Sequence, residues 1–396
     1  MAQNTWYSAP NLHRTDAIPD GKIGVGVIAP NYGLEHVSYL MDVPRYAHTV
    51  VRRVPLQRLE RKRSGNFWGN TPIVVRPHVP LLHTFNMLPM NGPPFVVTLE
   101  ARLPFYLGPH RDWQHKIGHA ILGSDRCRKI LAFSDTAAML ARRKFTALNR
   151  PDIVNKIITF RGAVLPSDTE QPRSDPKPDA PLRLIFVGAN GLRKGIIPLL
   201  DAIKQVRGEG ADITLTVVSS LPQRDYINPQ DTTSADIVRQ RLIDTDWVDY
   251  HASMPNPDVR AAMRDHDLLA FPTIDETLGW VTIEAAMEGI ATLASNAFAL
   301  PELVEDGVTG RIVPIPLNEN CKWTGFDAPD RSAALMDTYV MLRNGLVDAL
   351  RDAASDPAKV HRWGQAARTR LMAMYAPDAA ALRLQQIYDE ALDVSD

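Results

Sequence analysis

Apolar and polar residues alternate along the first half of the chain in a series of short runs. Helical spacing is seen between some of these runs, for example at 135–145 and in the stretch that opens at Gly33. The apolar, often β-branched runs lie at 22–30, 47–54, 72–75, 95–99, 130–133 and 157–160. Strands that alternate with helices predict a parallel sheet whose two faces are covered.

A proline-rich segment interrupts this pattern. Residues 166–181 hold five prolines among acidic and polar residues, a composition that supports neither a helix nor an inner strand. The apolar runs then resume at 182–188, 213–218, 247–251, 267–271, 291–295 and 311–315. The pattern therefore predicts two α/β domains joined by a linker.

We place the N-terminal domain at residues 1–165, the linker at 166–181 and the C-terminal domain at 182–375. The remaining residues, 376–396, have the spacing of an amphipathic helix, and the first domain is one place for its apolar face. A length of 396 residues also favours two domains over one core.

Composition narrows the function classes. Hydrophobic residues make up 45% and charged residues 22% of the chain, as in a soluble globular protein, and the formal net charge of −1 gives no overall attraction to nucleic acid. Cys127 and Cys321 form neither a disulfide framework nor a metal-ligand spacing. No apolar run reaches the roughly 18–20 residues that span a bilayer, and the first residues lack the order of a signal peptide. We expect a cytoplasmic protein.

Segment 271–289 holds the strongest candidate site. A strand-like run ends before a loop with Glu276, and a helical pattern begins near Gly279 or Trp280. The start of a helix presents free amide groups and the positive end of the helix dipole, so a diphosphate fits there. Glu284 lies about one turn, roughly 5–6 Å, into that helix. Carboxylates on both sides of a diphosphate suit a nucleotide sugar, which carries hydroxyls at both ends.

Glu276 and Glu284 are separated by seven residues and are followed by the acidic turn and glycine of 289–314. This sequence pattern resembles that of the retaining glycosyltransferases of family 4. The resemblance runs from about residue 22 to 314 and is strongest after the linker. It implies the α/β GT-B fold, in which two Rossmann-like parallel-sheet domains face each other across a cleft. It also implies metal-independent transfer, with retention of configuration, from a nucleotide-diphosphate sugar to an acceptor (a glycan, a lipid-linked molecule or a small molecule) that the sequence does not identify.

The resemblance assigns roles to single residues. Glu276 is expected to contact the transferred sugar, and Glu284 is expected to hold the ribose. The amide groups of Leu278, Gly279 and Trp280 are expected to meet the diphosphate.

A second motif, at 186–203, places Arg193 and Lys194 at a predicted helix start. Cations oppose the favoured charge at that end of a helix unless a phosphate lies between them and the dipole. The two side chains are then able to stabilise the charge of a departing diphosphate without a metal. We include Asn190 of the same loop among the donor-binding residues. The alternative is that both cations are ordinary surface groups.

Two Asp-x-Asp sequences bear on the alternative of a glycosyltransferase that depends on a metal ion. They are Asp244-Thr245-Asp246 and Asp265-His266-Asp267, and each directly precedes a predicted strand. That position is the amino edge of a parallel sheet, whereas ligands bind beyond the carboxyl edge. We therefore expect no metal site and no cofactor other than the nucleotide sugar as co-substrate.

Two features of the first half extend the resemblance. The loop after the first strand is similar to the family's Gly-Gly-x-Glu loop, with Gly33 as its second glycine. After the FVVTL run, Glu100 stands where the family commonly has a histidine. Glu100 is either a polar or catalytic group that faces sugar or acceptor, or a strand-end carboxylate that is paired with Arg102.

Residues 52–63 form a local basic cluster with six cations against Glu60. One interpretation is a solvated surface, and the other is a peripheral contact with an anionic acceptor or with the inner face of the membrane. Two rival functions also stay open, a nucleotide-sugar epimerase on the same fold and a non-catalytic nucleotide-sugar-binding protein. An enzyme that uses a nicotinamide is disfavoured because neither first strand is followed by Gly-x-Gly-x-x-Gly.

Overall fold

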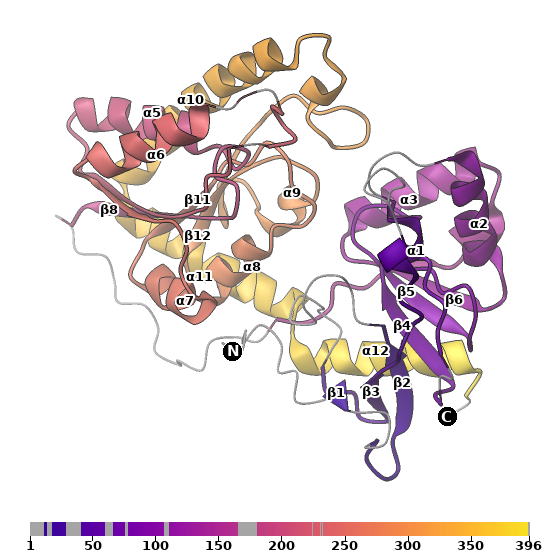
Figure 1. The fold of residues 1–396 in the computed structure, drawn as a ribbon. Helices are drawn as coiled ribbons and strands as arrows, with labels where there is room; N and C mark the ends of the chain where they lie inside the picture. Colours follow the sequence, from indigo (N-terminus) through magenta and orange to yellow (C-terminus); the bar gives the residue numbers. More distant parts are fainter. Residues whose placement is uncertain are drawn as a thin grey trace. The chain divides into compact units, whose positions relative to one another are not determined.

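The computed structural model divides into two compact units (Figure 1). The N-terminal unit contains residues 12–164 and 375–394, and the C-terminal unit contains residues 180–374. The structure describes residues 12–13, 18–28, 41–59, 66–75, 78–106, 111–164, 180–223, 225–229, 231 and 233–394. Gly33, most of the proposed linker and residues 60–63 of the basic cluster lie outside the described residues.

The N-terminal unit is built on a parallel sheet of seven strands in the order β1-β3-β2-β4-β5-β6-β7. Its strands are β1 (Leu12–His13), β2 (Ile23–Val27), β3 (Tyr46–Val50), β4 (Leu81–Phe85), β5 (Phe95–Leu99), β6 (Cys127–Ala132) and β7 (Ile157–Thr159). Its described helices are η3 (Leu56–Leu59), α1 (Phe67–Asn70), α2 (Asp112–Gly123), α3 (Asp135–Ala147), α4 (Pro151–Val154) and α12 (Pro377–Leu392).

The run at 72–75 is not a strand of this sheet, contrary to the sequence pattern. It makes one isolated bridge, between Val74 and Arg53. The side chain of Asn91 explains the difference, because its Oδ1 accepts from the Val74 amide at 2.7 Å and its Nδ2 donates to the Val74 carbonyl at 3.0 Å. A side chain thus satisfies the backbone groups that a neighbouring strand would otherwise pair.

The C-terminal helix α12 belongs to the N-terminal unit and contacts β4 and β6. Its Tyr388 is fully buried, and the phenol oxygen lies 2.9 Å from Nε2 of His48 and 2.6 Å from Nδ1 of His83. Nε2 of His83 in turn lies 2.8 Å from the hydroxyl of Thr98. This buried chain of polar groups fixes the position of α12 on the sheet.

The C-terminal unit has a six-stranded parallel sheet in the order β10-β9-β8-β11-β12-β13. Each of the six apolar runs predicted after the linker forms one of its strands. They are β8 (Leu182–Val187), β9 (Ile213–Val218), β10 (Val248–His251), β11 (Leu268–Phe271), β12 (Ala291–Ser295) and β13 (Gly310–Val313). The predicted α/β class is confirmed, with a parallel sheet in each unit.

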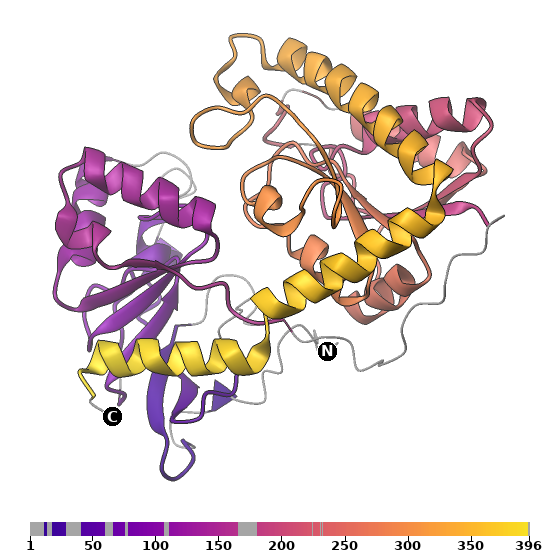
Figure 2. The same cartoon turned by 180° about the vertical axis from the view of Figure 1, so that it is seen from behind.

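Helices cover both faces of this sheet (Figures 1 and 2). One face carries α5 (Ile196–Gly208), α6 (Ser234–Asp244) and α10 (Arg331–Ser355). The other carries α7 (Asn256–Arg264), α8 (Trp280–Met287) and α11 (Pro357–Met374). The short elements α9 (Leu300–Leu303) and η4 (Thr324–Asp327) complete the unit. Strands β9, β8 and β11 are neighbours, so the loops at their carboxyl ends meet at one edge of the sheet.

Candidate functional site

The loop before α5 packs directly against the loop before α8. Gly195 precedes α5 with a φ of +83°, and a Cβ on it would collide with the carbonyl oxygen of Pro272. Only glycine combines this left-handed backbone with so close an approach. The amide of Ile274 donates to the carbonyl of Arg193 at 3.0 Å, which joins the two loops through their backbones.

Lys194 and Glu276 form a buried ion pair across this junction. The Lys194 ammonium donates to Oε2 of Glu276, and only 9% of the lysine and 15% of the glutamate side chain are exposed. The second carboxylate oxygen of Glu276 accepts from the Thr277 amide at 3.0 Å. Burial by itself would raise the pKa of Glu276, but the charge and hydrogen bond of Lys194 hold that pKa below its usual value. The carboxylate is therefore ionised at neutral pH.

Arg193 is the immediate neighbour of Lys194 but has different partners. Its NH1 donates to the carbonyl of Asp275 at 2.9 Å, and its guanidinium lies 5.3 Å from the centroid of the Tyr226 ring. Its Nε is 3.9 Å from Oδ2 of Asp225. Lys194 and Arg193 therefore have different partners, on the neighbouring residues Glu276 and Asp275.

Lys322 contributes a third cation that sequence reasoning did not identify. Its ammonium donates to the Asp275 carboxylate at 2.7 Å and to the Glu276 carbonyl at 2.9 Å. It follows β13 in a segment with no motif, so only the tertiary structure brings it to the β11–α8 loop. The effect is to fix the backbone that carries Glu276.

The start of α8 lies next to this cluster. Gly279 is the residue before the helix, with a φ of +89°, and a Cβ on it would lie 2.6 Å from the Leu300 side chain. The helix begins at Trp280, as the sequence pattern predicts, and has no acidic residue in its first turn. The amide end of α8, next to Leu278 and Gly279, is therefore an electropositive edge suited to an anion.

Glu284 lies on the second turn of α8 and is 3% exposed. Nδ2 of Asn256, at the start of α7, donates to its Oε1 at 3.1 Å. Burial raises the pKa of Glu284 to about 8, and neighbouring Glu288 adds to the shift. Among the described residues, none donates to Oδ1 of Asn256. The pair of side chains thus has unused hydrogen-bonding capacity.

Asn190 lies in the β8–α5 loop with a φ of +69°. The backbone amide of Asn190 donates to Ser220 Oγ at 3.3 Å. Its buried side-chain oxygen, Oδ1, accepts no hydrogen bond within the described part of the chain. Asn190 therefore lies at the carboxyl edge of the sheet, as do Arg193, Lys194 and Glu276.

Glu100 belongs to the N-terminal unit, directly after β5. Its Oε2 accepts from Nδ2 of Asn86 at 3.1 Å, and its amide donates to Oδ1 of the same asparagine at 3.1 Å. Asn86 follows β4 and was not named by the sequence reading. Arg102 donates to the carbonyl of Tyr106 at 3.5 Å and lies over the Phe105 ring. Glu100 is thus held at the carboxyl edge of the N-terminal sheet by an amide side chain.

The Asp-x-Asp residues lie at the amino edge of the C-terminal sheet. Asp244 ends α6, Asp265 directly follows α7, and Asp267 forms a bidentate ion pair with Arg183 at the start of β8. In the part of the chain that the structure describes, no three His, Cys, Asp or Glu side chains gather as a metal site would require. None of the described helices is both long and apolar enough to cross a membrane.

A family model matches the unit that holds this cluster. Residues 181–321 match the model described as "Glycosyl transferases group 1". The matched segment includes every candidate site residue of the C-terminal unit except Lys322. The C-terminal unit therefore carries a glycosyltransferase domain.

Curated relatives match about half of the chain. An α-maltose-1-phosphate synthase of Mycolicibacterium smegmatis is 24% identical over 203 residues, 51% of this chain and 46% of the relative. A D-inositol 3-phosphate glycosyltransferase of Corynebacterium kroppenstedtii is 28% identical over 205 residues, 51% of this chain and 43% of the relative. The chain spans less than half the length of these curated relatives.

Solved structures resemble the chain over both units. A sucrose-phosphate synthase from Thermosynechococcus elongatus superposes with a TM-score of 0.60 at 16% identity, covering 94% of this chain and 100% of that one. Anabaena HepE, solved in complex with UDP and glucose, superposes with a TM-score of 0.53 at 14% identity over 78% of each chain. At these identities the similarity concerns the fold, which is GT-B.

Proposed function

We propose that the chain is a retaining glycosyltransferase of family 4 that transfers a sugar from a nucleoside-diphosphate sugar without a metal ion. The observation that carries the proposal is the buried Lys194–Glu276 pair beside the amide end of α8. It combines a cation for a diphosphate with an ionised carboxylate for a sugar at one edge of the sheet. Its location inside a glycosyltransferase domain supports the proposal further.

The donor would bind with its diphosphate at the start of α8. Backbone amides near Gly279 and the helix dipole favour the negative charge, and Lys194 adds a full positive charge. Glu276 would accept hydrogen bonds from hydroxyls of the transferred sugar. Glu284, together with Asn256, would hold the ribose, since Oδ1 of Asn256 accepts no hydrogen bond from the described residues.

Cleavage of the sugar–phosphate bond adds negative charge to the departing diphosphate. Lys194 and Arg193 would stabilise that charge, which is the task that a metal ion performs in other transferases. Lys194 is suited to this role because its side chain is largely buried. Electrostatic attraction is stronger in the protein interior than in water. Lys322 would act indirectly by fixing the loop that carries Glu276.

The N-terminal unit would supply the acceptor side, with Glu100 as its candidate polar group. A uridine nucleotide is the first donor to test, because the structurally similar HepE was solved with UDP. The proposal also includes a peripheral contact of the 52–63 cluster with an anionic acceptor or the inner face of a membrane. Arg53 of that cluster is half-buried and donates to the Gly69 carbonyl at 3.0 Å, so it is directed into the unit.

The test is a thermal-shift and calorimetry series with UDP, GDP and ADP in the presence of EDTA. At 100 times its dissociation constant, a ligand adds about 2.7 kcal/mol of stability. We expect one nucleotide to bind, and the double variant Arg193→Ala/Lys194→Met to lose most of that affinity. Lys204→Ala, an exposed cation on α5, is the matched control. Absence of nucleotide binding by the unaltered protein would refute the proposal.

Incubation with the bound donor sugar separates the rival functions. Transfer to an added acceptor, or slow hydrolysis with the anomeric configuration retained, supports the transferase. Conversion of the donor into another nucleotide sugar without an acceptor indicates the epimerase. Binding without any turnover indicates a binding protein.

A further inference from the structure

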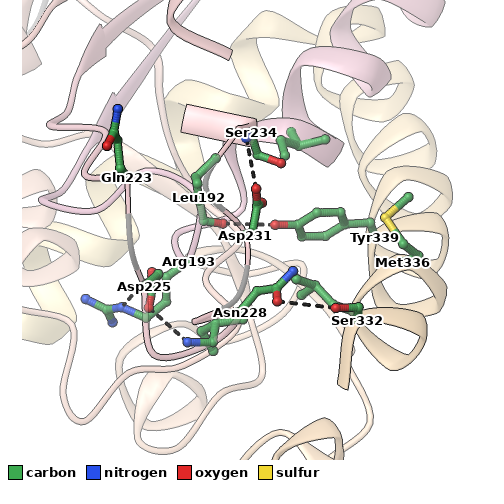
Figure 3. A pocket seen from close by; sticks show the side chains of 13 residues that line it. Leu192, Arg193, Gln223, Asp225, Asn228, Asp231, Ser234, Ser332, Met336 and Tyr339 are labelled. Atoms are coloured by element: carbon green, nitrogen blue, oxygen red, sulfur yellow. Dashed lines mark hydrogen bonds and ion pairs between the residues drawn. The ribbon is translucent and has the colours of Figure 1, made fainter. Parts of the chain in front are cut away.

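A cavity lies beside the β8–α5 loop, where Leu192 and Arg193 of that loop line it (Figure 3). It has a volume of about 280 Å³ and is enclosed by the start of α5, the segment between β9 and α6, and the first turns of α10. None of the residues that line it carries a role in donor binding except Arg193. The cavity therefore shares one residue, Arg193, with the proposed donor site.

The walls of the cavity are fixed by contacts within the fold. The ring of Tyr226 stacks on Phe326 with centroids 6.2 Å apart. Arg331, the first residue of α10, donates to the carbonyls of both, at 3.2 Å and 3.0 Å. Ser332 donates to Oδ1 of Asn228 at 3.3 Å. The segment after β9 is thereby tied to α10, so the cavity is present before any ligand arrives.

Asp225 is a lining residue with one carboxylate oxygen that accepts no hydrogen bond from the described residues. Its side chain is only 4% exposed. Oδ1 accepts from the Ile227 amide at 3.0 Å, but no described residue donates a hydrogen bond to Oδ2. Nε of Arg193 forms an ion pair with Oδ2 at 3.9 Å, which is beyond hydrogen-bonding distance. A buried carboxylate oxygen without a donor is costly, so a hydrogen-bond donor on a ligand would be well bound here.

The other wall groups narrow the ligand class. Leu192, Ile197, Leu335 and the ring of Tyr339 form apolar surface, and Asp231 adds a second carboxylate to the lining. Two carboxylates against one guanidinium disfavour an anion such as a nucleotide or phosphate. Apolar walls with a carboxylate acceptor match a sugar ring, which has an apolar face and hydroxyl donors. The volume lies just below the roughly 300–1,000 Å³ of ordinary small-molecule sites, which suits a single ring.

We propose that this cavity binds a neutral polyhydroxyl ligand of monosaccharide size, with Asp225 as the principal hydrogen-bond acceptor. The site does not depend on the proposed donor chemistry, because its ligand class carries no phosphate. It lies on the α5–α10 face of the sheet, whereas Glu284 lies on α8 at the opposite face. The ligand would be a second carbohydrate that the protein holds apart from any donor.

The test is saturation-transfer NMR on the full chain with D-glucose, D-galactose, D-mannose, N-acetyl-D-glucosamine and myo-inositol. Ethanolamine serves as the cationic comparison probe. We expect saturation transfer to at least one of the neutral polyols and not to ethanolamine. Binding of the amine alone, or of none of the probes, would overturn the proposal.

Variants assign the signal to the cavity. Asp225→Asn presents an amide donor in place of the acceptor and should weaken binding by roughly tenfold or more, the effect of losing a hydrogen bond to a charged group. Leu335→Phe fills the cavity without altering Asp225 and should also abolish the signal. Asp337→Asn on the exposed side of α10 is the control. A signal that survives Asp225→Asn and Leu335→Phe but disappears in Glu276→Gln belongs to the donor site and contradicts the proposal.

Discussion

Lys194 and Glu276 are 82 positions apart in the chain, yet their charged groups form a direct ion pair between the loop before α5 and the loop before α8. Both side chains are largely buried, so each depends on the other for the compensation of its charge. The same pair supplies the two charges that the proposed donor site needs. The contact therefore combines the compensation of two buried charges with a proposed role in donor binding.

The first prediction concerns the stability of this pair. Removing one partner leaves the other charge buried and uncompensated, so Lys194→Met should lower the free energy of unfolding by about 3 kcal/mol. Glu276→Gln should be costly for the same reason. The double variant should lose clearly less than the sum of the two single losses. Urea unfolding of all four proteins measures the coupling, and additive losses would show that the pair is not coupled.

A matched control exists on the surface of the same unit. Arg351 and Glu209 form an ion pair at 2.6 Å with both side chains exposed. Their replacement should cause a much smaller change, because solvent screens exposed pairs.

The fold was more predictable from the sequence than the site. All six strands of the C-terminal unit and the start of α8 at Trp280 follow from local apolar runs and from Gly279, because these features depend on neighbouring residues. The run at 72–75 has strand composition but is not a strand, since Asn91, distant in sequence, satisfies the Val74 backbone. Propensity alone does not contain that contact.

The partners of the site residues were less predictable. Lys322 and Asp225 lie in segments without a motif, and only the tertiary fold brings them to Asp275 and Arg193. The partner of Glu100 was equally hard to predict, because Asn86 follows a different strand. The sequence indicates which residue types gather at the carboxyl edge of a sheet, but it does not specify which atoms pair there.

A second prediction separates the two glutamates of the proposed donor site. Glu276→Gln should reduce transfer strongly and leave nucleoside-diphosphate affinity nearly unchanged, because its proposed partner is the sugar. Glu284→Gln should weaken the nucleoside diphosphate itself, because its proposed partner is the ribose. Calorimetry and transfer assays on both variants test this, with the exposed Glu319→Gln as control. Equal losses of nucleotide affinity would contradict the division of roles.

A third prediction follows from the pKa of about 8 that burial gives Glu284. In the unfolded chain the same carboxyl ionises near pH 4.3. Between these values the folded state binds more protons than the unfolded state, so Glu284 makes the protein less stable as the pH rises toward 8. Glu284→Gln removes this dependence. Thermal unfolding from pH 5 to about pH 9 should show a smaller decline for the variant, and parallel curves would refute the shifted pKa.

A fourth prediction concerns the attachment of α12 to the N-terminal sheet. Tyr388→Phe keeps the ring but leaves buried nitrogens of His48 and His83 without their phenol partner, which should cost about 1–3 kcal/mol. Burial and the nearby His48 hold the pKa of His83 well below its usual value. The unfolded chain therefore takes up a proton that folded His83 does not, and stability should fall as the pH drops below about 6.5. His83→Gln should flatten this part of the stability curve measured by urea unfolding.

The last prediction is that Glu100 acts in transfer and does not merely hold the end of β5. Its carboxylate lies at the carboxyl edge of the N-terminal sheet, where ligands of such sheets bind, and Asn86 fixes it from the neighbouring β4 end. Glu100→Gln keeps the shape and can still accept from Asn86, so fold and nucleotide affinity should persist while transfer falls by roughly 100-fold or more, the usual contribution of a positioned acid–base group. Asn86→Ala tests the orientation of Glu100 apart from its chemistry, since it keeps the carboxylate and removes the two hydrogen bonds with Asn86. It should lower transfer less than Glu100→Gln does, with a measurable loss of thermal stability. If Glu100→Gln instead lowers stability and leaves transfer per folded molecule unchanged, Glu100 is a structural residue.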